Sequence, residues 1–189
     1  MDRDEYTALL PILGAFDQYR RATEKCIEDK LWLPALVLIY SYIDSLAWLE
    51  STDDSIHGSV RFQAWADKWL LSRGNLNCSS IDLYGARSGL LHRMTSDSNL
   101  SEKGRARRII YDYVGVDPSS LLKDHHISSG ELVVVNLVTL ANETNDAAVE
   151  FMGSCDHDSS VRARFITKAE RFYSVYPNLG SLENVVPPG

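Results

Sequence analysis

The sequence predicts a mainly α-helical bundle, on the strength of three observations. Apolar residues recur every three to four positions along most of the chain, which is typical of helices that bury one face. The composition, with 189 residues of which 44% are hydrophobic and 24% charged, suits one globular domain with its own core. Only the segments 107–114 and 131–136 have the β-branched and aromatic content of strands. We expect one helical domain over 1–176, a flexible tail over 177–189, and no more β-structure than a small hairpin.

Four helices are expected in the first half of the chain. The first covers 4–29, where the apolar residues keep the helical rhythm. The second covers 33–50 and is apolar on nearly all sides, so it should lie at the centre of the bundle. The third covers 59–71, and the fourth covers 80–94, with Ser79 in the position of an N-cap.

Two strand candidates and two helices are expected in the second half. The segment 107–114 fits a strand by composition, although its apolar positions also fit a helix. A hairpin between this segment and the apolar run at 131–136 is the preferred interpretation. Helices over 137–153 and 159–175 then complete the domain, and Asp158 would cap the last one.

Charge, cysteine content and hydropathy limit the classes of function. The net charge of −7 argues against a general nucleic-acid binder, which would usually be basic. The three cysteines form no CxxC pair, as expected of a reduced, cytoplasmic protein. The first five residues are acidic and polar, unlike a signal peptide, and the longest apolar run, Leu31 to Tyr40, is too short to cross a membrane. We therefore expect a cytoplasmic protein that does not enter a membrane.

One arginine conflicts with the pattern of its helix. On an ideal helical wheel, Arg87 lies within the apolar stripe of the segment 80–94, where a permanently charged guanidinium needs an anionic partner. Asp44 repeats the conflict on the predicted helix 33–50, so an ion pair between the two would resolve both. A cation that binds a ligand and a purely structural ion pair are both compatible with this pattern.

His92 follows Arg87 by five residues and ends a row of small residues, Gly85, Ser88 and Gly89. Glycines weaken a helix by about 1 kcal/mol each relative to alanine, so we expect them to permit close approach of another backbone or of a ligand. On an ideal helix, Arg87 and His92 point about 140° apart. A straight helix would not easily aim both at one atom, which leaves a distortion at Gly89 or a site shared by two chains.

An arginine and a histidine at one site suit the cleavage of RNA through its 2′-hydroxyl group. Imidazole is the usual general acid or base near neutral pH, and guanidinium binds phosphate and stabilises developing charge. This chemistry needs no metal, and Ser88 would add a hydrogen bond. The candidate RNA-binding surface is the basic run Lys103, Arg105, Arg107 and Arg108, for which a solvated face is the alternative interpretation.

The segments Leu83 to His92 and Tyr40 to Ala47 resemble the HEPN superfamily of all-helical domains, whose motif is R-x4–6-H. The resemblance covers roughly residues 5–155 and implies a HEPN-like helical bundle. Many active members have an asparagine directly after the arginine, where this chain has Ser88. The motif therefore implies the fold more firmly than the activity.

The resemblance also implies roles for individual residues. In the family, the arginine and histidine of two protomers meet at a dimer cleft and form a metal-independent endoribonuclease. Arg87 and His92 would take these catalytic roles, with Ser88, Asp44 and Tyr84 in support. Members commonly belong to toxin–antitoxin and antiviral defence systems. The expected partners are single-stranded or loop RNA, a second copy of the chain, and an antitoxin or defence protein.

Two other functions remain open on the sequence. One is a non-catalytic dimeric module that binds a nucleotide or a protein partner, because some family members have lost cleavage. The other is a structural helical protein in which Arg87 and Asp44 only pair. The runs 124–126 (Asp-His-His) and 155–158 (Cys-Asp-His-Asp) contain metal-ligand residue types without a recognised zinc spacing. We therefore expect neither a metal nor a cofactor.

Overall fold

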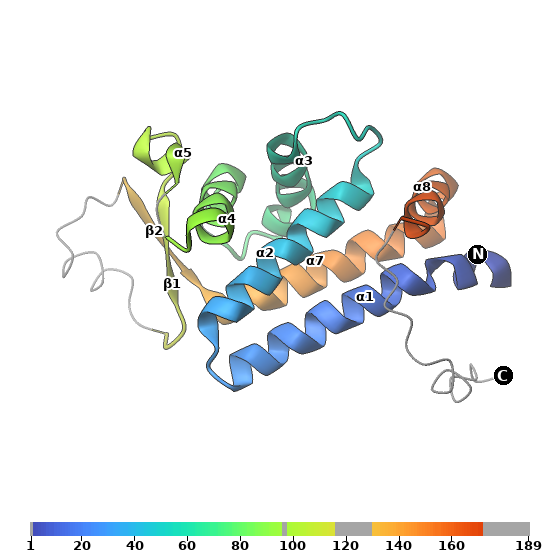
Figure 1. Cartoon of the computed structure of the whole chain (residues 1–189), viewed down its shortest axis with the longest axis horizontal. Helices are drawn as coiled ribbons and strands as arrows, with labels where there is room; N and C mark the ends of the chain where they lie inside the picture. The colour runs from blue at the N-terminus through green and yellow to red at the C-terminus, as the bar shows by residue number, and fades with distance from the viewer. Residues whose placement is uncertain (1, 96–97, 116–129, 172–189) are drawn as a thin grey trace.

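The computed structural model describes residues 2–95, 98–115 and 130–171, which form a mainly helical protein (Figure 1). This confirms the predicted fold class. The predicted tail at 177–189 lies outside the described residues. The elements in chain order are α1 (Arg3–Glu28), α2 (Trp32–Glu50), α3 (Gly58–Trp65), α4 (Ser80–Arg93), α5 (Asn99–Glu102), β1 (Arg108–Asp112), β2 (Leu132–Asn136), α7 (Leu137–His157) and α8 (Ser159–Ala169).

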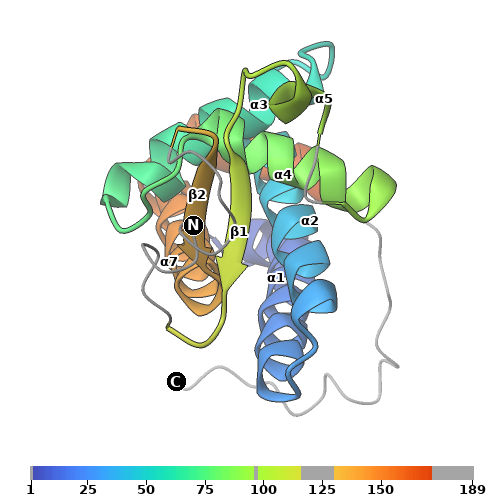
Figure 2. The same ribbon diagram turned by 90° about the vertical axis from the view of Figure 1, so that its left-hand side faces the viewer.

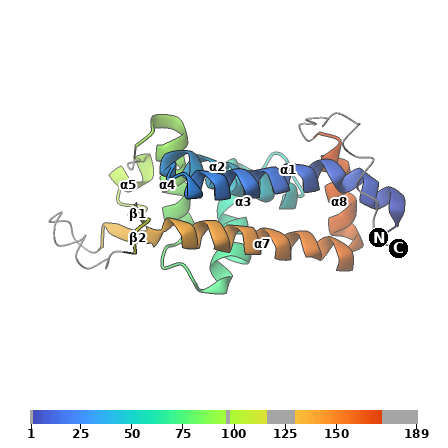
Figure 3. The same ribbon diagram turned by 90° about the horizontal axis from the view of Figure 1, so that it is seen from below.

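α2 is the central helix, as its apolar composition predicts. It contacts α1, α3, α4, α7 and α8. α1 and α2 form an antiparallel pair, and α7 runs beside them in a second layer (Figures 1 and 3). The helices α4, α3 and α8 follow one another along the length of α2 (Figure 1). The core side of α2 consists of fully buried residues, among them Ile39, Tyr40, Ile43, Leu46 and Leu49.

Within the described part of the chain, α2 alone has the length and apolar composition of a membrane span. The other elements bury half of this stretch. It also carries Asp44, which forms an ion pair with Arg87 of α4. A helix that is apolar on most sides and packs against several other helices has the properties expected of a core helix in a globular bundle.

The two strands form a parallel pair, so the predicted hairpin is wrong (Figure 2). Arg108 pairs with Leu132 and Asp112 pairs with Asn136. A hairpin joins antiparallel strands through a short turn, whereas parallel strands need a long connection, and here residues 113–131 supply its length. The sequence did hold a signal for this arrangement. Leu132 to Val135 are all buried, and a continuous apolar run is typical of a parallel strand that is covered on both faces.

Several helix bounds also differ from those predicted. The expected helix over 59–71 is regular only to Trp65, and continues as a π-helical turn, Ala66–Leu70, and a 3-10 turn, Leu71–Arg73. This wide turn keeps Trp65, Ala66 and Leu70 fully buried. The helix expected over 137–153 extends to His157, and α8 ends at Ala169 within the expected 159–175. α5 spans four residues, which is too short for a periodic signal.

A buried lysine closes the C-terminal end of α2. Lys168 of α8 is 7% exposed, and its Nζ donates to the carbonyl oxygens of Trp48 and Ser51, the latter at 2.6 Å. These carbonyls belong to the last turn of α2, where they lack helical partners and the helix dipole favours a cation. Burial lowers the pKa of Lys168, and the charge of Asp54 opposes that shift. Lys168 therefore fixes α8 to the end of the central helix.

Replacement of Lys168 by methionine should lower the free energy of unfolding by about 3 kcal/mol, because two carbonyls lose a charged donor in a buried position. Urea unfolding followed by circular dichroism measures this change. Lys25→Met is the matched control, since Lys25 forms only exposed ion pairs on α1 and its loss should cost less than about 1 kcal/mol. Equal losses in the two variants would contradict the role assigned to Lys168.

Candidate functional site

The predicted ion pair between Asp44 and Arg87 is present and joins α2 to α4. Arg87 Nε and Nη2 lie 2.8 Å and 2.7 Å from the same carboxylate oxygen, Asp44 Oδ2. The two side chains are 30% and 20% exposed, respectively, so the pair is largely shielded from water. Because two donors meet one oxygen, the plane of the guanidinium is held in a defined orientation.

Asp44 is held in its charged form against the effect of burial. Burial raises the pKa of the Asp44 carboxyl, while the hydrogen bond and charge of Arg87 oppose that rise. The charges of Arg61 and His92 also oppose it, yet the pKa remains above its ordinary value. As the pH falls through this raised pKa, Asp44 takes up a proton and Arg87 loses its ionic partner. The pair therefore responds to acid earlier than an exposed aspartate would.

His92 lies beside the same guanidinium. Arg87 Nη1 is 3.4 Å from His92 Nε2, and His92 is exposed. A guanidinium can only donate, so in this geometry the ring nitrogen accepts and a neutral imidazole carries its proton on Nδ1. On an ideal helix the two residues point about 140° apart, yet their side chains meet within one chain. α4 runs without interruption from Ser80 to Arg93, and the long arginine side chain bridges the angle between the two positions.

Tyr84 and Ser88, the other predicted supporting residues, are both half-buried on α4. The guanidinium carbon of Arg87 lies 5.7 Å from the centre of the Tyr84 ring, and that ring packs edge-on against Phe62 of α3. Tyr84 thus contributes a cation–π contact to the site. The Ser88 hydroxyl has no hydrogen-bond partner among the residues that the structure describes.

The first turns of α4 are fixed by local contacts. Ser79 and Asp82 form a capping box, in which each side chain accepts a hydrogen bond from the other residue's main chain. At Gly85, a Cβ atom would lie 3.2 Å from Ser98 Oγ and 3.3 Å from Ala106 Cβ. Gly85 therefore permits the chain around α5 to pass close to α4, which is the close approach expected of the small residues.

One residue of the basic run is bound to the protein itself. Arg107 donates from Nε and Nη2 to Asp82 Oδ2 at 3.0 Å and 2.7 Å, and its main-chain N–H donates to Asp82 Oδ1. Asp82 is 2% exposed, and although burial raises its pKa, hydrogen bonds from Ser79 and Arg107 hold that pKa below the ordinary value. Arg107 is therefore engaged in stabilising the start of α4.

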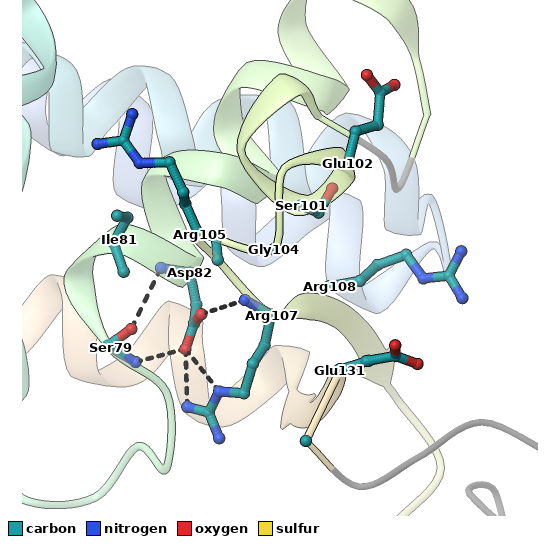
Figure 4. A pocket seen from close by; sticks show the side chains of 12 residues that line it. Ser79, Ile81, Asp82, Ser101, Glu102, Gly104, Arg105, Arg107, Arg108 and Glu131 are labelled. Carbon is teal, nitrogen blue, oxygen red and sulfur yellow. Dashed lines mark hydrogen bonds and ion pairs between the residues drawn. The ribbon is translucent and has the colours of Figure 1, made fainter.

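The rest of the basic run does not converge on one point. Lys103 and Arg105 are exposed and Arg108 is half-buried on β1. The chain from 101 to 108 lines an open hollow of about 620 Å³ beside the first turn of α4. Figure 4 shows the guanidinium groups of Arg105, Arg107 and Arg108 extending in three different directions. Donors that bind one phosphate should point toward it, so this hollow does not have the geometry of a phosphate site.

The described residues offer neither a metal site nor, at Cys78 and Cys155, a reactive thiol. No three His, Cys, Asp or Glu side chains there are grouped as a metal site requires. The run 124–126 lies outside the described residues, and in the run 155–158 the residue Asp158 caps α8. Burial raises the pKa of the Cys78 and Cys155 thiols to about 11, so neither is a ready nucleophile near neutral pH.

Sequence reasoning missed Arg61 of α3. Its charge opposes the raised pKa of Asp44, so it lies within electrostatic reach of the ion pair. Its Nη1 donates to the carbonyl oxygen of Asp54 at 3.4 Å. The sequence shows only an arginine beside the core residue Phe62 in an expected helix, which does not reveal what α3 faces.

Comparison with protein-family models, with curated proteins and with solved structures finds no significant match. Asp44, Arg87 and His92 form the candidate site, and their geometry defines what it can do. This arrangement provides one cation fixed in orientation, one exposed imidazole in contact with it, and a carboxylate that holds the cation in place. Such a set can bind an anionic group and move a proton beside it.

Replacement of Asp44 distinguishes its two roles, as a charge and as a hydrogen-bond acceptor. Asp44→Asn should lower the free energy of unfolding by about 1 kcal/mol, because the amide oxygen still accepts from Arg87 but the largely shielded guanidinium loses its counter-charge. Asp44→Ala should cost about 2 kcal/mol, because a largely buried guanidinium loses its acceptor. Urea unfolding at pH 7 measures both, and equal losses would contradict this account of the pair.

Proposed function

We propose that the protein is a metal-independent endoribonuclease that cleaves RNA through attack of a 2′-hydroxyl group. The observation that carries this proposal is the contact between Arg87 Nη1 and His92 Nε2, at 3.4 Å beside solvent. Together with the resemblance of the α4 segment to the R-x4–6-H motif, it gives the two residues complementary roles.

Arg87 would bind the scissile phosphate through Nη1, since Nε and Nη2 already donate to Asp44. On binding, the phosphate would replace His92 as the acceptor for Nη1, which frees His92 Nε2. His92 would then accept the 2′-hydroxyl proton through Nε2 or, in its protonated form, donate a proton to the leaving 5′-oxygen, and the solvent to which it is exposed would take part in the other proton transfer. The oxygen of the 2′-hydroxyl would then bond to phosphorus while the bond to the 5′-oxygen breaks, which gives a 2′,3′-cyclic phosphate and a 5′-hydroxyl end. Asp44 and Tyr84 would position the guanidinium, and Ser88 is free to donate to a phosphate oxygen.

The resemblance further implies a cytoplasmic homodimer that acts in a toxin–antitoxin or antiviral defence system under the control of a partner protein. The contact within one chain changes what a dimer would contribute. Each protomer would bring its own arginine and histidine as a pair, and two such pairs would share the cleft.

A non-catalytic module that binds a nucleotide or a protein partner is the second candidate function. The observation in its favour is that Asp44 already neutralises Arg87, which is what a structural ion pair requires. Such a module would bind without producing 2′,3′-cyclic ends and would tolerate loss of His92.

The decisive experiment compares the cleavage of single-stranded and loop RNAs in the presence of EDTA. Arg87→Ala and His92→Ala should each lower the rate at least about 100-fold, because each removes a group that acts on the transition state. Arg21→Ala and His157→Ala are the controls, since both residues are exposed and lie on other helices. Cleavage that persists in both site variants would refute the nuclease assignment.

A mixing experiment tests whether one chain supplies both groups. Equal amounts of the Arg87→Ala and His92→Ala proteins should remain below about a tenth of the wild-type rate, because no protomer then holds an intact pair. Recovery of activity on mixing would show instead that the arginine of one protomer acts with the histidine of another.

A further inference from the structure

A second group of cations lies around the C-terminal end of α2. The group has four members: Arg61 of α3, Arg164 and Lys168 of α8, and Arg171, which lies two residues after the end of α8. Burial lowers the pKa of Lys168 and Asp54 opposes this, while the charges of Arg164, Arg61 and Arg171 lower it further. All four cations contact the short stretch of chain from Trp48 to Asp54, so they share one neighbourhood although α3 and α8 are far apart in the sequence.

The cations of this group outnumber the carboxylates that they contact. Asp54 pairs with Arg171 at 2.5 Å and lies 3.7 Å from Lys168. Arg61 donates to the carbonyl oxygen of Asp54, and Arg164 donates to that of Leu49 at 3.3 Å. Over residues 2–95, 98–115 and 130–171, neither Arg61 nor Arg164 forms an ion pair with a carboxylate. A carbonyl leaves the charge of an arginine uncompensated, so the group retains positive charge at the surface.

This positive charge continues to the candidate site. Arg61 donates to the carbonyl oxygen of Asp54 beyond the end of α2, and its helix, α3, packs against both α2 and α4, which hold the ion pair. Its charge also acts on both Asp44 and Lys168. Along the axis of α2, Trp48 lies one turn, or about 6 Å, beyond Asp44, and Ser51 lies about 10 Å beyond Asp44. Figure 1 shows α4, α3 and α8 succeeding one another along α2. α4 carries Arg87, α3 carries Arg61, and Arg171 follows the end of α8.

We propose that an RNA strand cut between Arg87 and His92 extends along α2, where Arg61, Arg164 and Arg171 bind its phosphates. This inference rests on the proposed nuclease function and names the surface that holds its substrate. Lys168 is buried and fixes the end of α2, so it is not among the contacts. Single-stranded RNA fits best, because its flexible backbone can follow cations placed on three successive helices.

The test is RNA binding by the His92→Ala protein, in which cleavage does not consume the probe. The probe is a fluorescein-labelled 12-nucleotide single-stranded RNA, and fluorescence anisotropy is measured at several salt concentrations. Arg61→Gln/Arg171→Gln should raise the Kd roughly tenfold and lower the slope of log K against log salt by about 1.4, the value for two lost phosphate contacts. Arg20→Gln/Arg21→Gln, two exposed cations on α1, is the control with the same change in net charge.

The outcomes separate this inference from the nuclease proposal. If the wild-type protein cleaves RNA and the Arg61→Gln/Arg171→Gln variant matches the control in Kd, salt slope and KM, the inference about α2 is overturned. If the variant binds more weakly than the control but the wild-type protein does not cleave, the binding surface stands and the nuclease assignment fails. Absence of measurable RNA binding by the His92→Ala protein overturns the proposed surface.

Discussion

The ion pair between Asp44 and Arg87 is the constraint on which the candidate site depends. It connects the central helix to α4, and in it two of the guanidinium nitrogens donate to one carboxylate oxygen. The third nitrogen is thereby directed to His92. An arginine side chain at a surface normally samples many rotamers, and its ordering upon binding costs free energy. Here the ordering occurs when the protein folds, so the cation is already oriented when an anion arrives.

This pair could be predicted from the sequence because two unpaired charges on apolar stripes have one economical solution. The contact between Arg87 and His92 could not, because a helical wheel gives the direction in which each side chain leaves the backbone and ignores how far an arginine reaches. The basic run from Lys103 to Arg108 shows the opposite error. Those charges are neighbours in sequence, but Asp82 binds Arg107 and the other guanidinium groups point apart. Closeness in sequence within a strand or turn does not make side chains converge.

The elements of the fold could be predicted from the sequence, whereas part of their arrangement could not. Periodicity located the long helices and the central place of α2, and composition located both strands. The direction of β2 depends on α7, which begins directly after Asn136 and packs on α2, and so it is a property of tertiary packing. The same holds for the cations around Lys168, because Arg61 and Arg171 are 110 residues apart in the chain. Only the docking of α8 on the end of α2 brings them together.

The net charge of −7 argues less strongly against the proposed function once the positions of the individual cations are known. A phosphate responds mainly to charges within a Debye length, about 8 Å at physiological ionic strength, so its affinity depends more on the cations near it than on the net charge. If the proposed function holds, affinity would be confined to a strand that follows α2, because the net negative charge disfavours a polyanion that lies across the whole molecule. The acidic balance is therefore compatible with the proposed local RNA site.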